Sequence, residues 1–104
     1  MISVLVLYPR TENGSFDMDY YQSKHLPLFA SLLGDACMSW GAAAVKSGDW
    51  VAMGWAIVTS QEAFDAAIAE HGQKIRADVA NFTNLQLHRI VGDITALAPT
   101  PATG

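Results

Sequence analysis

The sequence of 104 residues contains a single cysteine and few charged residues. Charged side chains make up 15% of the chain, against about 25% in an average globular domain, whereas hydrophobic residues make up 51%. Intrinsic disorder requires low hydrophobicity and high charge, so this composition excludes it for the bulk of the chain. Cys37 cannot form an intramolecular disulfide, which fits a reducing, cytoplasmic location.

Other absences exclude several classes of function. The net charge is −4 and no cluster of basic residues occurs, so we expect neither a nucleic acid nor a membrane as partner. No apolar run approaches the ~20 residues of a membrane span, and the first ten residues lack the features of a signal peptide. No nucleotide-binding motif and no histidine pair with metal-ligand spacing occur, so we expect no cofactor and no metal.

The apolar pattern predicts four strands. Each is a short run rich in apolar residues, bounded by proline, glycine or polar residues. The predicted strands cover residues 2–8, 36–46, 51–59 and 85–94. Residues 95–104 are rich in proline and threonine, and we expect them to form a loose tail after a single domain of residues 1–94.

Helical spacing predicts one helix between the first two strands and a second before the last. Asp17 is a suitable N-cap for the first helix, and Gly34 is a suitable terminator. Pro27 lies inside this pattern and predicts a kink or break near Lys24. The second helix is expected to begin at the capping box of residues 59–62 and to end at Gly72, followed by a short extra helix through residue 82.

The resulting order βαββαβ predicts an α+β fold of the ferredoxin-like type. This fold has a four-stranded antiparallel sheet with both helices on one face. Such a sheet should alternate apolar and polar residues if its other face is wet, yet residues 4–7 and most of residues 51–58 are apolar. We therefore predict a homodimer that packs sheet against sheet. The alternative is that some of these apolar side chains are simply exposed.

The two middle strands carry large side chains in a regular pattern. If the loop between the strands has an even number of residues, all of these side chains share one face of the sheet. The sequence leaves open which face that is. The large residues are Met38, Trp40, Met53, Trp55 and Ile57.

The segment of residues 4–29 contains a strand ending in tyrosine, a loop, and then the pattern F-D-x-x-Y-Y-x-x-x-H-x-P-L. The pattern is carried by Tyr8, Phe16, Asp17, Tyr20, Tyr21, His25, Pro27 and Leu28. In this pattern the segment resembles proteins of the ethyl tert-butyl ether degradation (EthD) type. The resemblance implies a dimeric α/β barrel in bacterial catabolism, within gene clusters that include an oxidative ether-degradation system.

His25 is the strongest candidate for a catalytic residue. It follows Tyr21 by four positions, so both side chains project from one face of the helix. Histidine titrates near neutral pH and can transfer protons, and the tyrosine hydroxyl could assist it. The alternative is a buried histidine that only forms hydrogen bonds within the kinked helix.

The remaining candidates are residues that could bind a ligand. They share an aromatic ring, and together they predict a pocket for a small apolar molecule that contains oxygen. The alternative is that the aromatic residues build the core and the dimer interface. The candidates are Tyr8, Phe29, Trp40, Trp55 and His88.

Three functions are compatible with these residues. The first is an enzyme of catabolism, oxidoreductase-associated or isomerase-like, with His25 as proton shuttle and Tyr21 as its assistant. The second is a carrier or an accessory module of an oxidase, which would bind its ligand without forming product. The third, by analogy with related barrels, is haem binding through His25 or His88.

Overall fold

The computed structural model describes residues 1–98 and confirms the ferredoxin-like fold. Its four antiparallel strands lie in the order β2-β3-β1-β4. Residues 99–104, the end of the predicted tail, lie outside the described residues. The strands are β1 (Ile2–Pro9), β2 (Cys37–Ala44), β3 (Trp50–Val58) and β4 (His88–Asp93).

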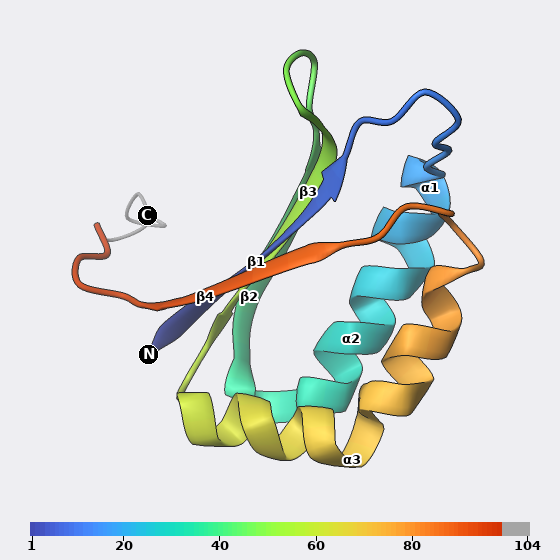
Figure 1. Cartoon of the computed structure of the whole chain (residues 1–104). Coiled ribbons are helices and arrows are strands. Elements are labelled where there is room, and N and C mark those ends of the chain that lie inside the picture. The colour runs from blue at the N-terminus through green and yellow to red at the C-terminus, as the bar shows by residue number, and fades with distance from the viewer. Residues whose placement is uncertain (99–104) are drawn as a thin grey trace.

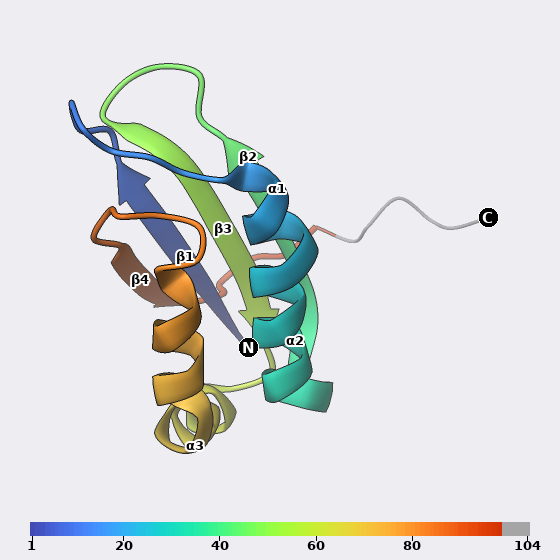
Figure 2. The same ribbon diagram turned by 90° about the vertical axis from the view of Figure 1, so that its right-hand side faces the viewer.

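The helices cover one face of this sheet (Figures 1 and 2). They are α1 (Met18–Tyr20), a π-helical turn (Tyr21–His25), α2 (Leu26–Leu33) and α3 (Gln61–Val79). None of the helices within residues 1–98 has the length and apolarity required to cross a membrane. The buried side chains between helices and sheet include Ile2, Val4, Val58, Leu33 and Phe64.

The predicted irregularity near Lys24 is confirmed as the π-helical turn. Asp17 caps the helix start, and Pro27, which has no N–H to donate, occupies the first turn of α2. The π-helical turn contains one extra residue, which rotates the following helix relative to the expected spacing. Consequently Leu26 and Leu33 are buried, whereas Leu32 is only half-buried.

The prediction for the second helix was wrong in two places. Ser60, not Thr59, is the N-cap, and its hydroxyl accepts a hydrogen bond from the Ala63 N–H at 3.1 Å. Gly72 does not end the helix, because α3 continues to Val79. Glycine costs a helix interior only about 1 kcal/mol, and packing on both sides of Gly72 outweighs that cost.

The two tryptophans of the hairpin lie on opposite faces of the sheet. Trp40 pairs with Ala56, which faces the helices, and Trp55 pairs with Gly41 on the other face. The large side chains of the two middle strands therefore do not all share one face of the sheet. The face without helices, termed the open face here, carries the apolar side chains of Leu5, Leu7, Met53, Trp55, Ile57 and Ile90.

Candidate functional site

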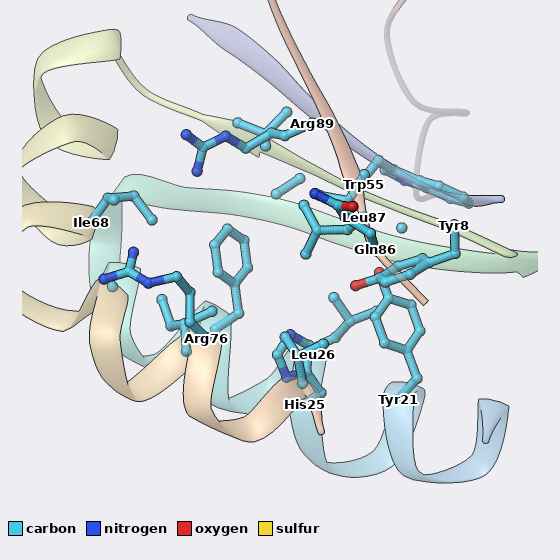
Figure 3. A pocket seen from close by; sticks show the side chains of 18 residues that line it. Tyr8, Tyr21, His25, Leu26, Trp55, Ile68, Arg76, Gln86, Leu87 and Arg89 are labelled. Carbon is cyan, nitrogen blue, oxygen red and sulfur yellow. The ribbon is translucent and has the colours of Figure 1, made fainter. Parts of the chain in front are cut away.

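A cavity of about 440 Å³ lies between the helices and the sheet (Figure 3). Strands β1 and β3 form one wall, and α2, α3 and the start of β4 form the others. Four of the predicted site residues line this cavity together: Tyr8, Tyr21, His25 and Phe29. Its size falls within the range of pockets for small molecules.

His25 is held in place by Asp78, a residue of α3. The His25 Nδ1 and Asp78 Oδ2 atoms are 2.9 Å apart, and the two side chains are 7% and 14% exposed. Partial burial acts to raise the pKa of Asp78, but hydrogen bonds from Tyr20, Asn81 and His25 outweigh it and lower the pKa below its usual value. Asp78 is therefore ionised at neutral pH and can only accept, so Nδ1 of His25 donates to it.

Two further side chains fix the carboxylate of Asp78. The Tyr20 hydroxyl donates to Asp78 Oδ1 at 2.7 Å, and Asn81 Nδ2 donates to the same oxygen at 2.9 Å. Both carboxylate oxygens thus have partners, and neither can turn away from His25 without breaking a hydrogen bond. The imidazole also contacts two rings, with ring centroids 5.7 Å from Tyr21 and 4.6 Å from Phe82.

The second ring nitrogen of His25 is open to the cavity. Within residues 1–98, every fully buried side-chain nitrogen and oxygen has a hydrogen-bond partner, yet Nε2 of His25 has none. Nε2 is therefore accessible, and the surface that His25 reaches is the wall of the cavity. In the neutral imidazole with its proton on Nδ1, Nε2 presents a lone pair that can accept a proton from a ligand.

Two tyrosine hydroxyls lie at the same end of the cavity (Figure 3). Burial raises the pKa of Tyr21 to about 12. Burial also raises the pKa of Tyr8, and the charge and hydrogen bonding of Tyr21 raise it further. Both hydroxyls therefore keep their protons at neutral pH and can donate to an oxygen atom of a ligand.

The other three predicted site residues do not place their side chains in this cavity. Trp55 borders the cavity, but its indole lies on the open face against Gly41. His88 also lies on the open face, with its ring 5.4 Å from that of Trp50. Trp40 lies on the edge strand β2, 40% exposed, and does not line the cavity.

Asp78 is the site residue that the sequence prediction missed. The sequence contained a sign of it, because Asp78 lies at helical spacing from two apolar residues, three residues after Ile75 and four before Phe82. A carboxylate at such a position needs a partner. No group of three or more metal-binding side chains occurs within residues 1–98.

Comparisons with known proteins agree with this fold. No family model and no curated protein matches the chain. Among solved structures, a dimeric ferredoxin-like protein from an uncultured marine organism has 10% identity and a TM-score of 0.66, over 95% of this chain and 98% of that chain. SnoaB, a cofactor-independent oxygenase from Streptomyces nogalater, has 10% identity and a TM-score of 0.59, over 99% and 97%. These two similarities concern the fold alone.

A third solved structure is much more similar in sequence. It is an EthD-like protein from Ralstonia eutropha JMP134, with 33% identity and a TM-score of 0.82. The similarity covers 91% of this chain and 92% of that chain. This agrees with the resemblance found in residues 4–29, and it extends well beyond that segment. The chain therefore belongs to the family of EthD-like proteins.

Proposed function

We propose that the protein binds a small apolar molecule containing oxygen and that His25 transfers a proton to or from it. The observation that carries this proposal is the Asp78–His25 pair at the wall of an apolar cavity, with Nδ1 bound and Nε2 accessible. A base that is oriented by a buried carboxylate is a recurring arrangement in catalysis. A histidine with only a structural role would not need an accessible second nitrogen.

The chemistry that fits this end of the cavity is enolisation of a carbonyl compound. The carbonyl oxygen would accept a hydrogen bond from the Tyr21 hydroxyl, while Nε2 of His25 removes a proton from the adjacent carbon. The electron pair of the broken C–H bond forms the carbon–carbon double bond of the enolate, and the π pair of the carbonyl moves to the oxygen, where the hydroxyl stabilises the developing charge. Asp78 stabilises the imidazolium that forms, and return of the proton at another atom would complete an isomerisation.

Proton exchange tests this proposal. The probe is tetralone, an enolisable bicyclic ketone, and NMR in deuterium oxide follows the loss of its α-proton signal. We expect the protein to accelerate exchange and His25→Gln to reduce the acceleration by about 100-fold or more. The matched control is His88→Gln, on the open face, which should leave exchange unchanged.

The outcomes separate the candidate functions. Equal exchange in the wild type and His25→Gln would exclude His25 as the shuttle. Binding of tetralone with no exchange above background would instead support a carrier or accessory module. Thermal stabilisation by the ligand measures binding independently of exchange.

We further propose that this function belongs to bacterial catabolism, as an isomerase-like or oxidoreductase-associated step in an oxidative degradation pathway. Membership of the EthD-like family supports this proposal. The cavity also supports it, because a lining with apolar walls suits intermediates of apolar compounds.

We also propose that two copies of the chain pair through their open faces. Trp55 and Ile90 on this face are 37% and 54% exposed, which is unusual for large apolar side chains in one contiguous patch. Similar structures described as dimeric ferredoxin-like proteins support the pairing. A second copy would cover the apolar face, which no other part of residues 1–98 covers.

A further inference from the structure

Two arginines line the cavity at the end away from the tyrosines. Figure 3 shows Arg76 and Arg89 beside Ile68, with Tyr8 and Tyr21 at the opposite side. Arg76 comes from α3 and Arg89 from β4, so separate elements place the two guanidinium groups on one cavity.

These two arginines differ from Arg10, the remaining arginine of the sequence. Arg10 donates hydrogen bonds to the carbonyl oxygens of residues 45, 48 and 50, and so has a structural role. Within residues 1–98, Arg76 and Arg89 donate to no protein oxygen and lie within 4.0 Å of no carboxylate. Their hydrogen-bonding capacity remains available to a ligand.

Both arginines are exposed to solvent, and each guanidinium group lies next to one neighbouring residue. The guanidinium of Arg76 folds back over Gly72, where a β-carbon would lie 2.8 Å from one of its nitrogens. The guanidinium of Arg89 lies 5.3 Å from the ring centre of Phe64, within the range of a cation–π interaction.

The charge of the cavity is opposite to that of the chain. The sequence has ten acidic and six basic residues, yet the cavity lining contains two arginines and no aspartate or glutamate. Arginine at such a position favours a planar anion, because its fork of donors matches the two oxygens of a carboxylate.

We infer that the natural ligand is a carboxylic acid with an apolar body, whose carboxylate binds between Arg76 and Arg89. This inference rests on the proposed function, and it specifies the class of molecule that the site takes. The apolar body then lies along Phe29 and Ile68, and the opposite end of the molecule reaches His25. The arginines bind the ligand and fix its direction, whereas His25 acts on it.

The test compares two ligands of the same shape and different charge. Naphthoate carries a carboxylate, and naphthamide is its neutral amide. Isothermal titration calorimetry gives both dissociation constants for the wild type, Arg76→Gln, Arg89→Gln and Lys74→Gln. Lys74 is the matched control, because it is an exposed cation on α3 that does not line the cavity.

We expect the wild type to bind naphthoate about tenfold or more tightly than naphthamide. Each arginine variant should lose most of this preference while its affinity for naphthamide stays constant, and Lys74→Gln should keep the preference. Equal affinities for the two ligands in the wild type would overturn the inference, as would equal losses for both ligands in the arginine variants. Either result would leave the exchange of tetralone unaffected, whereas failure of the proposed function would show in that exchange.

Discussion

The hydroxyl of Tyr21 lies against the backbone of Gly54, so closely that a β-carbon at position 54 would overlap the phenolic oxygen. Gly54 is buried in the central strand β3 and faces the helices. The strand must therefore have no side chain at this point for Tyr21 to reach its position in the cavity. A glycine of β3 thus determines where a hydroxyl from the π-helical turn can bind a ligand.

Gly54→Ala should displace Tyr21 and destabilise the protein. Overpacking of this kind costs about 1–3 kcal/mol, which urea unfolding would measure as a lower midpoint. Exchange of tetralone should also fall. The control is Gly92→Ala in β4, where a β-carbon would meet no atom within 4 Å. If both variants unfold at the same urea concentration, the close contact between Tyr21 and Gly54 does not affect the free energy of unfolding.

Asp78→Asn should remove a pH-dependent part of the stability. The pKa of Asp78 is lowered on folding, so its contribution is fully present above its unfolded value of 3.8 and is lost as pH falls through the lower folded value. We expect the variant to be less stable by about 1.5–3 kcal/mol at neutral pH and to approach the wild type as pH falls through the folded value of Asp78. Chemical denaturation across this range measures the difference. A difference that is constant with pH would contradict the lowered pKa.

The three tyrosines should resist ionisation in the folded protein. Burial raises the pKa of Tyr8 and Tyr21, the latter to about 12, and a hydrogen bond to Asp78 raises that of Tyr20. Ultraviolet absorbance should therefore show that Tyr8 and Tyr21 do not ionise near the ordinary pKa of 10.0 and that Tyr20 ionises above it. A raised pKa stabilises the fold below that ordinary value, and the stabilisation is lost as pH rises through the folded values. Titration of Tyr8 or Tyr21 near 10 in the folded state would contradict this result.

Ile90→Glu should convert the proposed dimer into a monomer. Ile90 lies on the open face, where a dimer would bury its side chain, and an unpaired buried carboxylate costs several kcal/mol. Sedimentation velocity would show the change in mass. The control, Ala66→Glu, adds the same charge on an exposed position of α3 and should remain dimeric. A wild type that sediments as a folded monomer would exclude the pairing itself.

The order of elements could be predicted from the sequence because each strand and helix start has a local signal. The cap at Asp17, the break caused by Pro27 and the glycine at the end of α2 each depend on a few neighbouring residues. The end of α3 could not be predicted in this way. Whether Gly72 interrupts a helix depends on packing against the sheet, which is a tertiary interaction.

The candidate site could be predicted only in part. The spacing of Tyr21 and His25 placed both on one helix face, and the structure confirms that they line the same cavity. Asp78 lies 53 positions from His25, and the sequence does not show which residues of α3 meet the first helix. The faces of Trp40 and Trp55 depended on the register of β2 and β3, which the sequence leaves open.

The pair of His25 and Asp78 joins the two halves of the chain. His25 precedes the loop between β2 and β3, and Asp78 follows it. A chain cleaved in that loop would yield two peptides, neither of which contains a complete dyad. Proton exchange after mixing them would then report their complementation, because the oriented imidazole exists only where the peptides have reassembled into one sheet.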